Sequence, residues 1–448
     1  MKKAIFFILC FTILSFYLFA DEEEFLDTEI AWADVGGNFV WPNEELAWED
    51  NFYEDETIEK EKKPFTMKRN LEFGLLNLNA NFSNNYLSVG QFFQELLVLD
   101  IDELQRGLGL NFGVGLSPFF FNYNRKDQWG FGLYTGVDLI GAVRISGNLL
   151  TLSEEKNDLS DFSAAAFGEI AIPTFFHVNN FKIKVRPALY YPLVFAKPDI
   201  VYNYYNEDEG TTFNLGADVR VYTAIPMESN LEDGFNLNEF SLTARPGVDF
   251  NIGVEFPLAE ALGLTETYSF LDFKVGVDLF NLPMVPSAMH DYMEIFIKAG
   301  KDEPITLFNE DNEIDIEELL EVLIEDAVYG EEKLTVLRPF KMHAWAHWFP
   351  FENKMISFIP TLGFAINPLY HQPFSFDGGI MACFNAKDMF LAAFGIGYLD
   401  RHWKNSLDLT FNLRAIELYL GVSLQSAAFL KSWSGAGVGV DFGLRFGW

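Results

Sequence analysis

Cysteine is nearly absent from this chain. Its 448 residues include two cysteines, Cys10 and Cys383. Cys10 lies in an N-terminal segment that we expect to be removed on export, so Cys383 would be the only cysteine of the mature protein. A single cysteine cannot form an intrachain disulfide. The chain is therefore not a secreted domain stapled by disulfides.

Positive charge is also scarce. Lys and Arg number 31 against 65 Asp and Glu, which gives a formal net charge of −34. Nucleic acids and anionic membrane surfaces are bound by clustered basic residues. This balance excludes both as expected partners.

Long apolar runs are missing from the chain after its N-terminal segment. A membrane-spanning helix needs about 18 consecutive apolar residues, and no later segment has them. Met1-Lys2-Lys3, an apolar run to Phe19 and then Ala20 predict an export signal, residues 1–20, cleaved after Ala20. An uncleaved anchor is the alternative. Residues 21–70 are acidic and are predicted to form a largely disordered leader. Alternatively, its aromatic residues dock in the lumen of a barrel or on a partner.

Apolar and aromatic residues are abundant, at 49% and 17% of the chain, with 48 Phe. They recur at every second position. The closing stretch GVGVDFGLRFGW (437–448) places Val, Phe, Leu and Trp on one face of a strand and Gly, Asp441 and Arg445 on the other. In a membrane, the apolar face would contact lipid and the other face a wet interior.

The alternation predicts an all-β chain, a transmembrane antiparallel β-barrel of about 14 strands with a range of 12–16. Many of the expected strands exceed the roughly 9–11 residues that cross a bilayer at a tilt. A shift of the apolar phase near residue 415 is interpreted as a bulge within one long strand. The expected strands are 72–82, 108–123, 128–146, 160–177, 181–195, 211–224, 243–257, 269–281, 333–349, 355–367, 373–385, 389–400, 404–424 and 434–448.

Two segments depart from this pattern. Residues 71–107 are predicted to be the first strand or a plug with short helices, and residues 108–448 the barrel. An acidic helical insertion is expected at about 283–332, with an amphipathic helix from Asp315 to Ala327. If Leu71–Phe82 is the first strand, that helix lies on the periplasmic side, and if this stretch is part of a plug, the helix is external.

Motifs for catalysis or metal binding are weak. His343 and His347 are four residues apart, but on a strand this separates them by roughly 13 Å, too far to share a metal. The acidic stretch 309–320 lacks the Gly and the terminal Glu of a calcium loop, with Ile314 and Leu320 in those places. No GxSxG or HExxH motif accompanies a histidine. We expect no enzyme activity, metal or cofactor.

Charged residues of both signs fall on the glycine-bearing face of the strands. They predict a hydrated lumen with internal ion pairs, serving either as a conductive path or as structural pairing alone. The candidates are Asp138, Arg144, Lys182, Lys184, Arg186, Asp218, Arg220, Asp249, Glu255, Asp272, Lys274, Asp278, Asp408, Arg414, Glu417, Asp441 and Arg445.

Three stretches resemble the FadL-like superfamily of outer-membrane barrels, the long-chain fatty-acid transporters and their relatives. They are LEFGLLNLNANFSNNYLSVG (71–90), DFKVGVDLFNLP (272–283) and the closing GVGVDFGLRFGW. The resemblance implies a barrel of about fourteen strands with an N-terminal plug. An Asn-Pro-Ala hatch motif is missing near the N-terminus. Phe446 and Trp448 look like the recognition signal for the barrel-assembly machinery.

The leading hypothesis is therefore an outer-membrane channel or transporter that admits small solutes, hydrophobic ones included, by a passive route. Its expected partners are outer-membrane lipid, the barrel-assembly machinery and a small solute. One alternative is a structural or surface-exposed outer-membrane protein with a closed lumen. A further alternative is a soluble periplasmic β protein.

Overall fold

The computed structural model describes most of the chain from residue 70 onward. The described residues are 70–84, 108–125, 128–145, 156–158, 161–196, 199–207, 210–224, 243–267, 269–305, 322–324, 328–366, 374–386, 389–399, 402–413, 415–426, 429–433 and 435–447. The expected signal peptide, the acidic leader up to residue 69 and the short helices within 85–107 lie outside this range.

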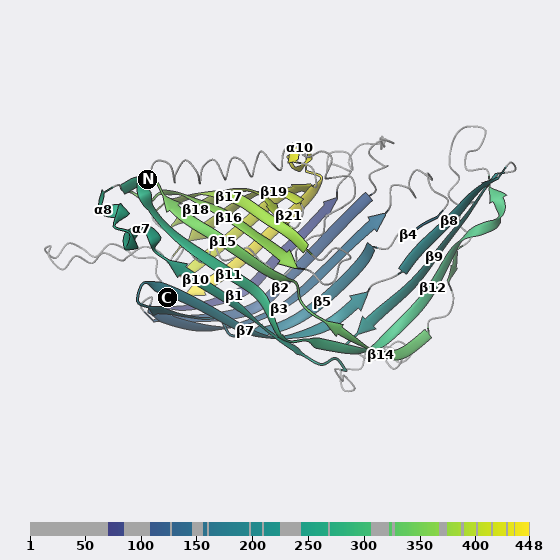
Figure 1. The fold of residues 1–448 in the computed structure, drawn as a ribbon. Coiled ribbons are helices and arrows are strands. Elements are labelled where there is room, and N and C mark those ends of the chain that lie inside the picture. The colour runs from purple at the N-terminus through teal and green to yellow at the C-terminus, as the bar shows by residue number, and fades with distance from the viewer. Residues whose placement is uncertain are drawn as a thin grey trace.

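Antiparallel strands close into a barrel of fourteen positions (Figure 1). The first strand pairs with both the second and the last, so the ring has no open edge. In ring order the strands are β1 (Leu71–Asn84), β2 (Leu108–Arg125), β3 (Trp129–Ile145), β5 (Asp161–Ala171) continued by β6 (Thr174–Val178), β7 (Phe181–Ala196), β10 (Gly247–Phe256), β11 (Asp272–Val285), β15 (Phe340–Phe349), β16 (Ile356–Ile366), β17 (Phe374–Ala386), β18 (Phe390–Leu399), β19 (His402–Asn412), β20 (Ile416–Ser426) and β21 (Gly437–Gly447).

The outer face of the ring is apolar. On β3, the exposed side chains include Phe131, Leu133, Val137 and Leu139, while the alternate positions around Asp138 are buried. The same alternation holds on β20 and β21. A closed barrel turns one face of every strand outward, and a continuous apolar band there is stable only against lipid. The predicted transmembrane antiparallel barrel of about 14 strands is confirmed.

Aromatic rings gather at both ends of the barrel. The end where β1 begins and β21 finishes is called here the terminal end. Stacked or tilted ring pairs at this end include Trp129 with Phe131 and Phe181 with Phe256. At the opposite end, called the far end, the ring of Trp403 lies against that of Phe429. Two such girdles are typical of strands that cross a bilayer, since amphipathic rings sit at its interfaces.

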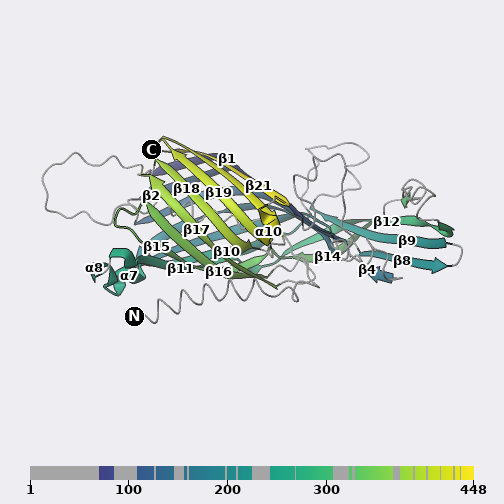
Figure 2. The same ribbon diagram turned by 90° about the horizontal axis from the view of Figure 1, so that it is seen from above.

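A second group of strands, the extension, projects beyond the far end, while two short helices, α7 (Leu258–Ala261) and α8 (Leu264–Thr267), lie at the terminal end (Figures 1 and 2). Within the described residues, no helix is long and apolar enough to cross a membrane. The extension consists of β4 (Lys156–Asp158), β8 (Asp199–Glu207), β9 (Gly210–Thr223), β12 (Ser287–Ile305), β13 (Val322–Ile324) and β14 (Val328–Val336).

The extension and the barrel wall share an apolar cluster. Its buried members come from ring strands, such as Phe167 and Tyr190, and from the extension, such as Tyr222, Met289 and Val336. Strand β9 pairs with the end of β7 and along β12, which in turn pairs with β14. The extension is therefore packed onto the barrel through side chains as well as through backbone hydrogen bonds.

The structure corrects the expected long strand 404–424. It is two strands, β19 and β20, paired from Trp403 with Ser426 to Asn412 with Glu417. The backbone N–H of Leu413 donates to Ile416 O at 2.8 Å, which closes the turn between them. The phase shift that suggested a bulge is therefore a tight turn.

The expected helical insertion at 283–332 is wrong where it can be compared with described residues. The segment from Ser287 to Ile305 is strand β12, and Val322–Ile324, within the expected helix, is strand β13. Residues 306–321 and 325–327 lie outside the described part. Leu71–Phe82 belongs to strand β1, so the plug interpretation of this stretch is wrong too.

The expected sidedness of that insertion also changes. Strand 211–224 was counted as crossing the barrel, but it is β9 of the extension and leaves the ring. Consequently β11 runs from the terminal end to the far end, and the chain between β11 and β15 departs from the far end. The sequence analysis, with Leu71–Phe82 as the first strand, predicts this segment at the terminal end. The structure has it at the far end instead.

Candidate functional site: the lumen cavity

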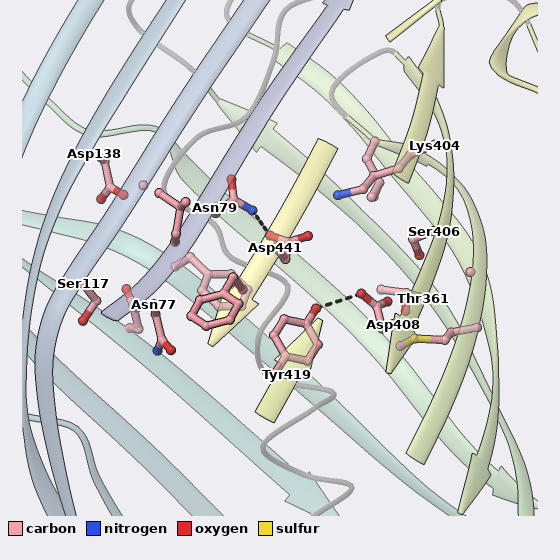
Figure 3. A pocket seen from close by; sticks show the side chains of 18 of the residues that line it. Asn77, Asn79, Ser117, Asp138, Thr361, Lys404, Ser406, Asp408, Tyr419 and Asp441 are labelled. Carbon is pink, nitrogen blue, oxygen red and sulfur yellow. Dashed lines mark hydrogen bonds between the residues drawn. The ribbon is translucent and has the colours of Figure 1, made fainter. Parts of the chain in front are cut away.

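A cavity of about 260 Å³ lies inside the barrel. Side chains from β1, β2, β3 and from β16 to β21 line it, so it spans the lumen. More than half of its lining residues carry a side chain that hydrogen-bonds, among them Asn77, Ser117, Thr361 and Ser406 (Figure 3). Apolar patches such as Phe280 complete the wall. A cavity of this size has room for several water molecules or for a small solute.

Strand register places a row of polar residues across this wall. Asn79 on β1 pairs with Asp441 on β21, which pairs with Gly421 on β20, which pairs with Asp408 on β19. The amide of Asn79 donates to Asp441 Oδ1. The hydroxyl of Tyr419 donates to Asp408 Oδ1 at 2.7 Å (Figure 3). Residues paired in this way share one face of the sheet, so the row looks into the cavity.

The row continues in the other direction along the ring. Asn79 pairs with Gly115 on β2, and Gly115 pairs with Asp138 on β3. A Cβ atom at position 115 would lie 2.9 Å from Asp138 Oδ1, so that carboxylate leans over the glycine. Six neighbouring strands thus present Asp138, Gly115, Asn79, Asp441, Gly421 and Asp408 side by side.

A buried ion network borders the cavity near the junction with the extension. Arg338, which is 7% exposed, joins two carboxylates. Its Nη2 donates to Asp249 Oδ1 at 2.6 Å and its Nε to Asp249 Oδ2 at 2.7 Å, while Nη1 donates to Glu169. Arg186 donates to the other oxygen of Glu169. Such charges remain buried because each has a hydrogen-bonded partner of opposite sign.

A second cluster surrounds Glu255. The Nζ atoms of Lys182, Lys184 and Lys274 lie 3.9, 4.0 and 3.6 Å from its carboxylate oxygens. Three strands, β7, β10 and β11, bring these four residues together, because Lys182 and Glu255 pair in register. None of the four lines the cavity.

Four other predicted lumen residues, Glu417, Arg445, Asp278 and Asp272, belong to strands of the ring. Glu417 contacts Arg445 at 3.5 Å, and Arg445 lines the cavity. Asp278, which is buried, accepts a hydrogen bond from Trp345 Nε1 at 2.6 Å. Asp272 pairs at 2.9 Å with Lys354, which is half exposed.

Two predicted lumen residues lie outside the ring. Asp218 and Arg220 belong to β9 of the extension, because that strand pairs with β12. Arg220 Nε donates to Glu294 at 2.5 Å, and this hydrogen bond raises the pKa of Arg220. Arg144 pairs through its backbone with Gly109, its side chain being outside the described part. Arg414 and Trp448 lie outside it as well.

Sequence reasoning missed Glu169 and Arg338, which hold the buried network together. Glu169 alternates with Ile170 and Ile172, which face outward, and this alternation was a usable signal. Arg338 had none, because LTVLRPFK was interpreted as the interior of one strand, 333–349. The structure ends β14 at Val336 and starts β15 at Phe340, so Arg338 stands in the link between extension and barrel.

The histidines of the lumen are used as hydrogen-bond partners. His343 Nε2 lies 3.1 Å from Asp377, and His347 Nε2 lies 2.9 Å from Ser357 Oγ. His402 contacts the amide of Asn111 at 3.3 Å. Within the described residues, no group of His, Cys, Asp and Glu is arranged to hold a metal ion.

Fold and cavity together define a class: a closed transmembrane β-barrel with a polar chamber in its lumen. No family model and no curated protein sequence matches the chain. Among solved structures, the toluene transporter TodX of P. putida is similar, at a TM-score of 0.45 and 8% identity, over 85% of this chain and 90% of that one.

Other barrels are similar as well. A FadL homologue of Pseudomonas aeruginosa has a TM-score of 0.42 and 11% identity, over 84% of this chain and 89% of that one. The translocator domain of autotransporter NalP from Neisseria meningitidis has a TM-score of 0.31 and 6% identity, over 85% and 89%. These similarities concern the fold alone. They include a FadL homologue, and the FadL-like superfamily is the one that three stretches of the sequence resemble.

Proposed function

We propose that the chain is a channel of the bacterial outer membrane through which small solutes pass without an energy source. The observation that carries the proposal is the lumen cavity, whose wall carries polar and charged side chains and whose outer face is apolar. Lipid covers the outer face, and a hydrated chamber in the lumen supplies the route. The closed ring supports a membrane barrel over a soluble sandwich of two sheets, because β1 pairs with both β2 and β21 and no strand edge is left open.

The proposal includes the expected partners. The two aromatic girdles support contact with membrane lipid at both interfaces. Phe446, near the end of β21, is part of the proposed signal for the barrel-assembly machinery, together with Trp448. Export through a signal peptide of residues 1–20 fits this route, since outer-membrane barrels are made in the cytoplasm and cross the inner membrane first.

A structural protein with a closed lumen is the second candidate function. One observation favours it: Arg338 and the apolar cluster around Tyr190 fill part of the interior where the extension meets the barrel. An open lumen predicts faster swelling of protein-containing liposomes and a closed lumen predicts no difference, so a swelling assay decides between the two functions.

Liposome swelling with the purified, refolded full-length chain tests the channel. Vesicles containing the protein and vesicles of the same lipid without it are diluted into an isosmotic solution of a small sugar or amino acid. Faster swelling of the protein vesicles is expected. Equal rates, with the barrel shown to be folded by heat-dependent gel migration, would leave the closed-lumen protein as the conclusion.

A further inference from the structure

The wall of the lumen cavity is mixed in character and unevenly charged. More than half of the residues that line it have hydrogen-bonding side chains, although apolar atoms make up the larger share of its surface. Acidic residues outnumber basic ones along the wall, with four against three. The distribution of their partners makes the difference larger.

The basic residues of the wall are largely engaged by carboxylates. Arg186 donates to Glu169, and Arg445 contacts Glu417, which lies outside the cavity lining. Lys404, four residues before Asp408 on β19, interacts electrostatically with the Asp408 carboxylate. The row is therefore only partly compensated: Lys404 acts on Asp408, whereas Asp441 accepts a hydrogen bond from the neutral amide of Asn79.

The partners of the row are neutral donors. Asp441 accepts from the amide of Asn79, and Asp408 accepts from the hydroxyl of Tyr419. Neither donor cancels the charge of the carboxylate that it contacts. An amide or phenol also fixes the orientation of the carboxylate, so that the oxygen without this bond is presented at a defined position.

Glycine brings two of the carboxylates together. A Cβ atom at position 421 would lie 2.7 Å from Asp408 Oδ1 and 3.0 Å from Asp441 Oδ2. Any side chain larger than hydrogen would occupy the space between the two acids. Gly421 thus lets the two carboxylates lie close to each other over one glycine, on the face that lines the cavity.

We propose that this cavity binds small organic cations, with Asp408 and Asp441 across Gly421 as the binding carboxylates. The inference rests on the proposed channel function, since a solute reaches the cavity through the lumen. An ammonium or guanidinium group donates hydrogen bonds to carboxylates, and its charge is attracted by both.

The first experiment measures ion selectivity in planar bilayers under a KCl gradient. A unit charge about 5 Å from the path of an ion changes its local concentration by about two- to fourfold, allowing for salt. The wild-type chain is expected to favour K⁺ over Cl⁻. Asp408→Asn and Asp441→Asn should each lower this preference by about two- to fourfold. Glu331→Gln, an exposed position of the extension, removes the same charge and should leave the preference unchanged.

The second experiment compares two probes of equal length and opposite charge. Binding of putrescine and of succinate to the detergent-purified barrel is measured by equilibrium dialysis. Saturable binding of putrescine alone is expected, and it should be lost in the Asp408→Asn/Asp441→Asn double variant. Heat-dependent gel migration establishes that each variant is folded. The comparison of putrescine with succinate on the wild-type protein tests the site even if a variant does not fold.

The outcomes separate the two proposals. If the barrel conducts but shows no preference between K⁺ and Cl⁻, or prefers Cl⁻, the cation site is wrong and the channel function stands. A barrel that conducts nothing but binds putrescine overturns the channel and keeps the site. If the folded wild type binds neither probe, or both equally, the cation site is wrong.

Discussion

Replacement of Arg338 by alanine should destabilise the barrel strongly. The guanidinium, 7% exposed, holds Asp249, which is 1% exposed, through two hydrogen bonds of 2.6 and 2.7 Å. Glu169 keeps Arg186 as a partner after the change. The loss therefore falls mainly on Asp249, which would be left as a buried carboxylate facing a cavity where the guanidinium had been.

The magnitude follows from this geometry. Breaking a buried ion pair by removing one partner costs about 3–5 kcal/mol, because the remaining charge stays buried without compensation. The link between β14 and β15 would also lose its anchor in the lumen, although Ser287 Oγ still donates to Val336 O at 2.6 Å. We expect the free energy of unfolding of Arg338→Ala to fall by about 3–5 kcal/mol.

Urea unfolding of the refolded protein in lipid vesicles, followed by tryptophan fluorescence, measures this change. Lys354→Ala is the matched control. It breaks a pair with Asp272 of similar length, 2.9 Å, but the lysine side chain is 46% exposed. Exposed pairs contribute about 0–1 kcal/mol, so the control should remain close to wild type.

A double-mutant cycle separates the ion pair from lost packing. Arg338→Met keeps most of the side-chain volume, and Asp249→Asn removes the charge that would be left behind. The stability lost by the double variant is expected to be smaller than the sum of the two single losses by about 0.5–3 kcal/mol. A loss below about 0.5 kcal/mol in Arg338→Ala, or strict additivity in the cycle, would refute the reasoning.

Two further substitutions test the wall of the barrel by the same unfolding assay. Gly276→Ala should cost about 1–3 kcal/mol, because the ring of Trp345 occupies the position of the new Cβ, whereas Gly168→Ala meets only atoms 3.7 Å away or farther and should be tolerated. Equal losses would show that the ring is free to move. Val137→Arg, on the outer face near the middle of β3, should cost about 2–4 kcal/mol, against about 0–1 for Val178→Arg at the end of β6. A similar cost at both depths would contradict the placement of the lipid band.

The phase of the strands could be predicted from the sequence because lipid and lumen demand different side chains. In the closing stretch 437–448, the valines were placed on one face and Arg445 on the other, and the exposure agrees, since Val440 is exposed and Arg445 is buried. A period of two is a local signal, which a single sequence contains in full. The same signal showed a shift of phase near residue 415, but without a Gly or Pro there it did not distinguish a turn from a bulge.

The strand number, fourteen, was reached with two compensating errors. Strand 211–224 was counted as part of the ring although β9 belongs to the extension, and 404–424 was counted once although it forms β19 and β20. Both errors concern which strands pair. Pairing depends on contacts between distant residues, which alternation along the chain does not encode.

The row of aspartates could likewise be predicted only in part, because the sequence indicates the face of each residue but not how the strands align. The sequence placed Asp138, Asp408 and Asp441 on the interior face one strand at a time. Their alignment depends on two irregularities elsewhere: Leu76, with a φ of 62°, interrupts the β1–β21 ladder between Gly74 and Leu78, and β2 shifts its register against β3 between Leu116 and Phe119.

Each irregularity moves the residues beyond it by one position, which in a strand exchanges the two faces. Before the break, β1 buries Glu72 and Gly74, which are even positions, and after it Asn79 at an odd position accompanies Asp441 at the cavity. Without the break, Leu78 would face the cavity and Asn79 the lipid. The polar chamber therefore exists because the first strand changes face at Leu76, and the chemistry of the lumen is set by backbone register as much as by composition.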